Sequence, residues 1–233
     1  MKINIYADGA NIEEMLAALN STAVRGFTTN PTLMRKAGIT NYLSFAEEVL
    51  EKITTLPVSF EVFSDDFEEM YIQAKKLAAL GKNVFVKIPV TNTRGDFSGD
   101  LIERLDKENV KMNITAVFTV QQIRNILEKV SSDTPHILSV FAGRIADTGV
   151  DPVPIMKEAR RTIRSYNKNL QLLWASPREV LNVYQADEMG CDIITLSPAL
   201  LKKLPLKGKD LEEFSRETVL MFYDDARSSG FGL

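Results

Sequence analysis

Short hydrophobic runs alternate with longer amphipathic stretches along almost the whole chain. The runs are rich in β-branched residues, which favours strands, whereas the longer stretches repeat apolar residues every three or four positions, which favours helices. Strands are predicted at residues 3–7, 26–29, 58–63, 84–90, 112–118, 137–141, 171–175 and 193–196. Helices are predicted after them, at about 12–20, 32–52, 67–80, 101–108, 120–130, 153–166, 179–189 and 199–204.

This alternation implies parallel strands joined by right-handed crossovers. Eight such units in about 200 residues are typical of a (β/α)8 barrel. An open doubly wound sheet alternates as well, but it usually carries a glycine-rich phosphate turn after its first strand. The turn here, Ala7-Asp8-Gly9-Ala10-Asn11, lacks that spacing, and no P-loop occurs. We therefore predict an α/β chain with a single (β/α)8 TIM barrel domain over residues 1–233.

The run at 84–90 holds one lysine, Lys87, among apolar residues. A run that is apolar on both faces is typical of a buried parallel strand. Burial disfavours the charged form of a lysine, and a neutral amine is a nucleophile that forms Schiff bases with carbonyls. Two simpler interpretations stay open from this run alone: the amine reaches water, or it pairs with a carboxylate.

The composition excludes several function classes. The 233 residues are 45% hydrophobic and 25% charged, as in ordinary globular proteins. A net charge of −3 and a pI of about 5.4 argue against nucleic-acid binding. No apolar run is long enough for a membrane span, and the first residues show no signal-peptide pattern. The single cysteine, Cys191, fits a reducing compartment, and one cysteine with one histidine makes no zinc cluster. We expect a cytoplasmic protein without a metal or membrane partner.

In such barrels the chemistry lies at the carboxyl ends of the strands, and the opposite end serves stability. Polar residues at or near the carboxyl ends are Asp8, Thr28, Thr29, Asn30, Glu61, Lys87, Asn113, Thr115, Ser139, Arg144, Ser176 and Arg178. Each one alone is explained by contact with solvent. Nearly every strand contributes one, however, and Glu61, Lys87 and Thr115 lie inside apolar runs. His136 precedes the sixth strand, so we expect it at the surface or the bottom of the barrel and not as a base.

These residues suggest carbonyl chemistry. A substrate carbonyl would condense with Lys87 to a carbinolamine and then an iminium, an electron sink that lets the neighbouring carbon–carbon bond break. Asp8 and Glu61 are the candidate acid and base, and Thr115 is a candidate for holding a water that relays protons.

The same strand ends suggest how a sugar would bind. Asn30 and Asn113 are candidates for hydrogen bonds to its hydroxyls. Arg144, Ser176 and Arg178 would form a basic corner for a distal anion. A simpler role for Arg144 is an ion pair with Asp147 or Asp151.

Five motifs, in order along the chain, resemble those of the transaldolase family. They are Gly26-Phe27-Thr28-Thr29-Asn30-Pro31-Thr32, Val86-Lys87-Ile88-Pro89-Val90, Asn113-Ile114-Thr115-Ala116-Val117-Phe118, Ser139-Val140-Phe141-Ala142-Gly143-Arg144-Ile145 and Ala175-Ser176-Pro177-Arg178. The length matches the small branch that includes fructose 6-phosphate aldolase. The resemblance implies a cofactor-free class I barrel with Lys87 as the Schiff-base lysine and Asp8, Glu61 and Thr115 around a catalytic water. It implies substrate contacts from Thr28, Asn30, Asn113, Ser139, Phe141, Arg144, Ser176 and Arg178.

Two positions separate the branches of this family. Its aldolases place a glutamine and a tyrosine around the catalytic water, where transaldolases have a glutamate and a phenylalanine. The chain has Glu61 and Phe141. The resemblance therefore implies a transaldolase of the pentose phosphate pathway, which transfers a dihydroxyacetone unit from a ketose phosphate to an aldose phosphate. The alternatives are an aldolase that releases free dihydroxyacetone, a non-catalytic sugar-phosphate-binding barrel, and a decarboxylase or isomerase on the same barrel.

The chain departs from the family pattern at three places. Residues 91–100 form a longer, glycine-bearing loop, Trp174 is large for its position, and Pro177 is unusual there. A sulfonated sugar therefore stays open as a substrate beside a sugar phosphate. Arg94 in the long loop either joins the anion corner or is a solvated loop charge.

Beyond the eighth unit, residues 210–228 predict one more amphipathic helix. Leu211, Phe214, Thr218, Met221 and Phe222 lie on one face at helical spacing. This face must be buried on the chain's own barrel or on a neighbour's. The small branch of the family forms rings, often decamers, with this tail, so the resemblance implies a homo-oligomer.

Overall fold

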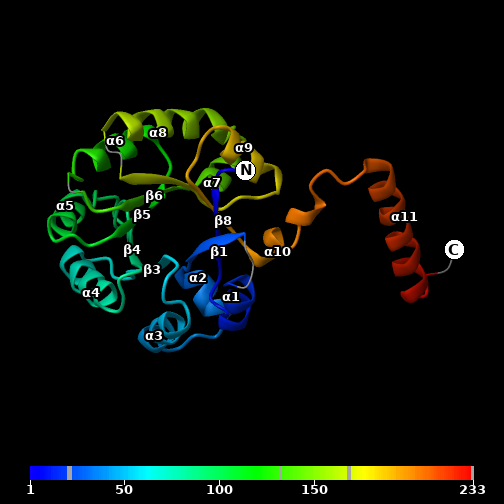
Figure 1. Ribbon diagram of the computed structural model, residues 1–233, viewed down its shortest axis with the longest axis horizontal. Coiled ribbons are helices and arrows are strands. Elements are labelled where there is room, and N and C mark those ends of the chain that lie inside the picture. Colours follow the sequence, from blue (N-terminus) through cyan, green and yellow to red (C-terminus); the bar gives the residue numbers. More distant parts are fainter. Residues whose placement is uncertain (20–22, 132, 167–168, 232–233) are drawn as a thin grey trace. The chain divides into compact units, whose positions relative to one another are not determined.

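The computed structural model describes residues 1–19, 23–131, 133–166 and 169–231. Its contacts divide the chain into two compact units, Met1–Leu201 and Lys202–Leu233. In the described part of the first unit, eight parallel strands form a closed barrel in which each strand pairs with its sequence neighbours and β8 pairs with β1 (Figure 1). This confirms the predicted TIM barrel.

The strands are β1 (Asn4–Asp8), β2 (Val24–Thr28), β3 (Val58–Glu61), β4 (Val84–Pro89), β5 (Met112–Val117), β6 (His136–Val140), β7 (Leu170–Trp174) and β8 (Ile193–Leu196). The helices of the first unit are α1 (Ile12–Leu19), α2 (Pro31–Lys36), α3 (Tyr42–Lys52), α4 (Phe67–Ala79), α5 (Gly99–Lys107), α6 (Val120–Leu127), α7 (Ala142–Ala146), α8 (Pro152–Tyr166), α9 (Leu181–Glu188) and α10 (Pro198–Leu201). Every predicted strand is present, with ends that differ by one or two residues.

Two helix predictions need correction. The single helix expected at 32–52 is two helices, because Gly38 takes a left-handed φ of 72° that ends α2, and the Asn41 side chain caps the start of α3. The short helix α7, directly after β6, was not predicted. The expected end of the first helix, at Asn20, lies outside the described residues.

The barrel interior has an apolar layer directly below a polar one. Side chains two positions apart on a strand point the same way, so Tyr6, Phe85, Ile137 and Ile193 form a buried cluster beneath Asp8, Lys87, Ser139 and Thr195. Burial raises the pKa of Tyr6 to about 12, so its phenol stays neutral in this layer. The layer closes the barrel below the strand ends.

Gly26 on β2 makes room for one member of this apolar layer. A Cβ atom at this position would lie 2.5 Å from the Tyr6 ring. Only glycine lets the ring of Tyr6 lie against the β2 backbone.

The second unit contains a 3-10 turn (Leu204–Leu206) and the helix α11 (Leu211–Ser228), whose N-terminus is capped by Asp210. The expected helix at 210–228 is therefore present. None of the residues of α11 is buried. In the part of the chain that the structure describes, no helix is long and apolar enough to cross a membrane. The single domain over residues 1–233 and the cytoplasmic location stay predictions.

Candidate active site

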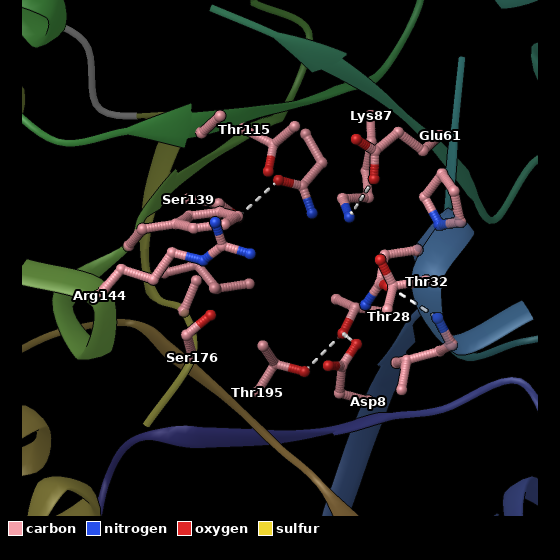
Figure 2. Close-up of a pocket in the computed structure, with 18 residues that line it drawn as sticks. Asp8, Thr28, Thr32, Glu61, Lys87, Thr115, Ser139, Arg144, Ser176 and Thr195 are labelled. Atoms are coloured by element: carbon pink, nitrogen blue, oxygen red, sulfur yellow. Dashed lines mark hydrogen bonds and ion pairs between the residues drawn. The ribbon is translucent and has the colours of Figure 1, made fainter. Parts of the chain in front are cut away.

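A pocket of about 500 Å³ opens at the carboxyl ends of the strands (Figure 2). Its lining residues are Asp8, Thr28, Asn30, Pro31, Thr32, Leu33, Glu61, Lys87, Asn113, Thr115, Ala116, Ser139, Phe141, Arg144, Leu173, Ala175, Ser176 and Thr195. They come from all eight strands, from the turns that follow them, and from the helices α2 and α7. Eleven of the twelve residues that the sequence assigns to catalysis or substrate binding lie here; Arg178 does not.

Lys87 lies inside the barrel, with a side chain that is 8% exposed. Its Nζ donates hydrogen bonds to the carbonyl oxygen of Thr29, at 2.8 Å, and to Glu61 Oε2, at 2.7 Å. Glu61 and Lys87 are register partners on neighbouring strands, so the sheet itself sets the carboxylate beside the amine (Figure 2). Of the two simpler interpretations of Lys87, the structure shows the one in which it pairs with a carboxylate.

The hydroxyl of Tyr42 fixes the end of β3 at Glu61. It accepts a hydrogen bond from the Glu61 backbone N–H and donates one to the Glu61 carbonyl oxygen, each at 2.7 Å. Burial is the main cause that raises the pKa of Tyr42, so the hydroxyl keeps its proton. The position of the Glu61 carboxylate thus depends on a side chain of α3.

Asp8 stands across the pocket from this pair and belongs to a chain of hydroxyls. Thr28 Oγ1 donates to Asp8 Oδ1 at 2.8 Å and lies 2.5 Å from Thr195 Oγ1. Because the Thr28 proton is used on Asp8, Thr195 is the donor in the second bond. The pKa of Asp8 is raised, because the desolvation of its carboxylate outweighs the nearby Lys87 ammonium and the Thr28 hydrogen bond. Asp8 therefore holds a proton more readily than an ordinary aspartate.

Thr195 is a site residue that was missed from the sequence. It sits two positions after the buried Ile193, as Lys87 sits two after Phe85 and Ser139 two after Ile137. The period of two along β8 was the available signal.

On the β5 side, Asn113 links three strands. Its Nδ2 donates to Ser59 Oγ at 3.1 Å, and its Oδ1 accepts from Ser139 Oγ at 2.7 Å. Thr115 lies one step nearer the mouth, and its Oγ1 is buried without a hydrogen-bond partner among the described residues. Such a hydroxyl is ready to bind a water or a substrate oxygen.

A bulge in β5 shapes this wall. The register with β6 shifts between Ile114 and Val117, and Ala116 takes a left-handed φ of 58°. Thr115 and Ala116 consequently both face the pocket, although consecutive strand residues normally point to opposite sides.

The distal corner of the pocket is built by two segments in close contact. Gly143 lies against the turn after β7: a Cβ on Gly143 would lie 1.4 Å from the Ser176 carbonyl oxygen. Ser176 has a φ of 56° and precedes Pro177, a conformation that costs about 1–3 kcal/mol and is held by the surrounding structure. This contact brings Ser176 beside Arg144.

Arg144 points into the pocket, and its guanidinium carbon lies 5.5 Å from the centre of the Phe141 ring (Figure 2). The simpler role considered for Arg144, an ion pair with Asp147 or Asp151, does not appear among the described residues. Asp147 instead pairs with Arg178 through two contacts, Nε to Oδ1 at 2.9 Å and Nη2 to Oδ2. In this structure the Arg178 guanidinium therefore lies outside the pocket, because a neighbouring carboxylate holds it, and its role in the basic corner stays a prediction.

Several other residues singled out from the sequence lie outside the pocket. The Thr29 hydroxyl donates to the Ser59 carbonyl oxygen, and only its backbone touches Lys87. Arg94 pairs with Asp96 and Asp65 on the surface, as expected of a solvated loop charge. Trp174 and Pro177 are buried but do not line the pocket.

His136 is fully buried at the start of β6, so the bottom of the barrel is confirmed as its place and the surface is wrong. Its Nδ1 accepts from the Met112 N–H at 3.1 Å, and its Nε2 lies 2.8 Å from Asp106 Oδ1. Burial lowers the pKa of His136 more than the Asp106 carboxylate raises it, so the ring stays neutral.

Taken together, the pocket places one lysine amine between two carboxylates, with an unpartnered hydroxyl nearby and a guanidinium at one end. Such a site can take a carbonyl compound with hydroxyls and a distal anion, and it can move protons around the carbonyl. The chain is thus a TIM barrel with a lysine-centred pocket at the strand ends.

The comparisons with known proteins give the family. Residues 5–230 match the family model described as Transaldolase/Fructose-6-phosphate aldolase. A probable transaldolase of Thermoplasma volcanium is 36% identical over 216 residues, which cover 92% of this chain and 93% of that protein. A probable transaldolase of Bartonella henselae is 33% identical over 91% of this chain and 94% of that protein. The chain belongs to the transaldolase/fructose-6-phosphate aldolase family, as the resemblance of its motifs predicted.

Solved structures share the fold. The 3-hexulose-6-phosphate synthase of Salmonella typhimurium superposes with a TM-score of 0.58 at 14% identity, over 87% of this chain and 91% of that chain. KGPDC of Streptococcus mutans gives a TM-score of 0.55 at 11% identity, over 84% of this chain and 88% of that chain. At these identities the likeness concerns the barrel alone.

Proposed function

We propose that the protein is a class I transaldolase that carries a dihydroxyacetone unit on Lys87 as a Schiff base. The observation that carries this proposal is the buried Lys87 amine, 2.7 Å from Glu61 and in one pocket with Asp8. A pocket that only binds a sugar needs no amine held between two proton-transfer groups. The alternative, a non-catalytic sugar-phosphate-binding barrel, does not explain why the Lys87 amine lies with Glu61 and Asp8 in one pocket.

The first step needs a neutral amine. In the resting site the Lys87 ammonium donates to Glu61, so Glu61 is placed to take its proton as a substrate carbonyl approaches. The free amine adds to the carbonyl carbon, and the carbinolamine loses its hydroxyl as water when a proton is returned to it. A water bound by the Thr115 hydroxyl is the relay that we assign between these groups.

The second step breaks the carbon–carbon bond. A base removes the proton from the hydroxyl on the fourth carbon of the ketose, and the bonding electrons move into the iminium as an aldehyde leaves. Asp8 suits this role, because its raised pKa makes its carboxylate a stronger base than an ordinary aspartate. The enamine left on Lys87 then attacks an acceptor aldehyde. No cofactor is needed, because the iminium is itself the electron sink.

Transfer is favoured over release by what surrounds the enamine. Phe141 lines the pocket and packs against the apolar layer of the barrel, where it offers no proton. Without a donor at this position, protonation of the enamine is slow and an acceptor aldehyde captures it. An aldolase that frees dihydroxyacetone is the second candidate function.

The substrate we propose is an anionic ketose. Asn30 and Asn113 are the candidate ligands of its hydroxyls, and Arg144 with Ser176 forms the end that receives its anion. These groups can hydrogen-bond a phosphate or a sulfonate, so a sugar phosphate and a sulfonated sugar are both candidate substrates.

The experiment compares cleavage of fructose 6-phosphate with and without an aldose phosphate acceptor. A transaldolase forms glyceraldehyde 3-phosphate only when the acceptor is present. We expect Phe141→Tyr to raise the release of free dihydroxyacetone at the expense of transfer, because the new hydroxyl can protonate the enamine. An unchanged ratio of release to transfer would count against this role of Phe141.

We also propose that the protein is a homo-oligomer, because it resembles the small branch of the transaldolase family, whose members often form decamers. Helix α11 exposes a set of large apolar side chains: Leu211, Phe214, Val219, Leu220, Met221, Phe222 and Tyr223. An apolar surface of this kind favours coverage by a second copy of the chain. Light scattering should give a multiple of 26.1 kDa, and a mass of one chain would contradict the proposal.

A further inference from the structure

Two arginines lie at or beside the distal end of the pocket, and of these two Arg144 lines it, whereas Arg178 does not. The second, Arg178, follows Ser176 by two residues, so its backbone stands beside the lining. This backbone is fixed on two sides, because Ser176 packs against Gly143 and the Arg178 N–H donates to Asn182 Oδ1 at 2.8 Å. Its guanidinium is held by Asp147.

Asp147 belongs to the same corner. It is the C-cap of α7, three residues after Arg144, and its backbone N–H donates to the Gly143 carbonyl oxygen. Its pKa is lowered, chiefly by the hydrogen bond from Arg178 and in smaller part by the charges of Arg178 and Arg144. The negative charge of Asp147 thus offsets part of the positive charge that Arg144 and Arg178 would otherwise present to a ligand.

The pair is exposed and therefore weak. The side chains of Arg178 and Asp147 are 48% and 51% accessible, and solvent screens ion pairs at such positions. A phosphate or sulfonate offers a guanidinium the same two-pronged contact as a carboxylate, and a phosphate can carry more charge. An anion held by Arg144 and Ser176 can therefore compete for Arg178.

We propose that Asp147 is a competing anion that sets the affinity of the distal site for anionic substrates. It holds Arg178 off the pocket until a substrate anion replaces it. The corner then contains two guanidiniums and one carboxylate, and it discriminates between a ketose with an anionic end and one without. The kinetic test of this inference rests on the proposed transaldolase function, whereas the binding test does not.

The test is Asp147→Asn, which removes the charge and keeps the shape. We expect the KM for fructose 6-phosphate to fall about two- to fivefold, the range that a weak exposed pair allows, with kcat unchanged. The KM for fructose, a ketose donor without an anionic end, should not move. Glu179→Gln is the matched control, because Glu179 is exposed, carries the same charge beside Arg178 and makes no ion pair among the described residues.

Each of three kinetic results would overturn the proposal. A higher KM for fructose 6-phosphate in Asp147→Asn would show that Asp147 places Arg178 for binding. An equal fall in Glu179→Gln would show a general charge effect. In Asp147→Asn with Arg178→Met, the gain in affinity should disappear, and a gain that persists would exclude Arg178 as the group released.

A binding measurement separates this inference from the catalytic proposal. Inorganic phosphate should raise the melting temperature of Asp147→Asn more than that of the wild type, whether or not the chain turns over a ketose. If the enzyme proves inactive but this difference is seen, the transaldolase proposal fails and the anion site stands. Equal shifts in the two proteins, or no shift in either, would overturn the anion site.

Discussion

The two ends of the barrel bury polar groups in opposite ways. At the amino ends of the strands, His136 uses both ring nitrogens, one on the Met112 N–H and one on Asp106, and Asp106 also accepts from the Ser131 N–H. At the carboxyl ends, the Thr115 hydroxyl has no partner among the described residues and Asp8 has a raised pKa. The first arrangement is satisfied and inert, whereas the second keeps capacity for a ligand.

The backbone shows the same contrast. Two non-glycine residues with left-handed φ, Ala116 and Ser176, line the pocket. A third, Asn109, precedes β5 at the amino end, but asparagine adopts this conformation more readily than alanine or serine. Strain of this kind costs about 1–3 kcal/mol per residue and is characteristic of functional sites. The amino end of the barrel thus contributes stability, whereas the carboxyl end loses some of it to the site. A substitution at each end can test this.

The largest expected effect is on stability, at the amino end. His136→Leu removes the hydrogen bonds of the neutral ring to the buried Asp106 carboxylate and to the Met112 N–H, which should lower the free energy of unfolding by about 2–5 kcal/mol. The kcat per folded molecule should stay unchanged, because the ring lies against Asp106 of α5 at the amino end of β6, away from the pocket. Urea denaturation and active-site-normalised kinetics measure the two quantities, and a loss of kcat without a loss of stability would reverse the roles of the two ends.

The same histidine gives wild type a pH dependence. Because the pKa of His136 is lower in the folded protein than the ordinary 6.5, the unfolded chain binds a proton that the folded chain refuses. This contribution to stability is present above pH 6.5 and is lost as the pH falls below it. His136→Leu should lack this contribution.

At the mouth, Asp8→Asn should exchange activity for stability. Removing the proposed base should lower kcat about a hundredfold. The raised pKa means that the folded state binds a proton more tightly than the unfolded state, so ionised Asp8 destabilises the fold above the ordinary value of 3.8. Asp8→Asn should therefore be more stable than wild type at pH 7, and its advantage should shrink as the pH falls towards 3.8.

Urea denaturation of Asp8→Asn between pH 5 and pH 8, at about one-unit steps, follows this difference. An advantage that grows towards acid pH would contradict the raised pKa. A variant with wild-type kcat would remove Asp8 from the mechanism.

The smallest expected effect belongs to Thr115→Val, which keeps the shape of the side chain and deletes its hydroxyl. Since Oγ1 has no partner among the described residues, its loss should leave the melting temperature unchanged or slightly higher. Loss of the relay water should lower kcat about tenfold. A fall in stability with unchanged kcat would mean that the hydroxyl has a structural role.

The sequence predicts the fold well because the strands and helices of the barrel each show a local repeat of hydrophobic residues. Each strand run and most helices could be placed from spacing, since the period of two and the period near 3.6 each bury one face. The break in the helix at 32–52 depended on the left-handed conformation of Gly38, and α7 is too short to show a period. These features arise from local backbone geometry that periodicity does not encode.

The site was predicted as far as it lies on strands. Lys87, Glu61 and Asp8 could be found because their strand positions fix where they point. The contact of Arg178 with Asp147 could not be predicted, because Arg178 lies on a turn, where no strand direction fixes its guanidinium. Thr195 was overlooked although it follows the same period of two.

The most direct test is to trap the intermediate. The wild-type protein and the variants Lys87→Met and Lys82→Met are each incubated with fructose 6-phosphate and borohydride, and their intact masses are compared. Lys82 is the control position because it is an exposed lysine that precedes β4, at the amino end of that strand. Wild type and Lys82→Met should gain one reduced dihydroxyacetone unit, peptide mapping should place it on Lys87, and Lys87→Met should gain nothing. The proposed Schiff-base function would be contradicted by an adduct of equal yield on Lys87→Met, or by no adduct on wild type with either fructose 6-phosphate or a sulfonated ketose.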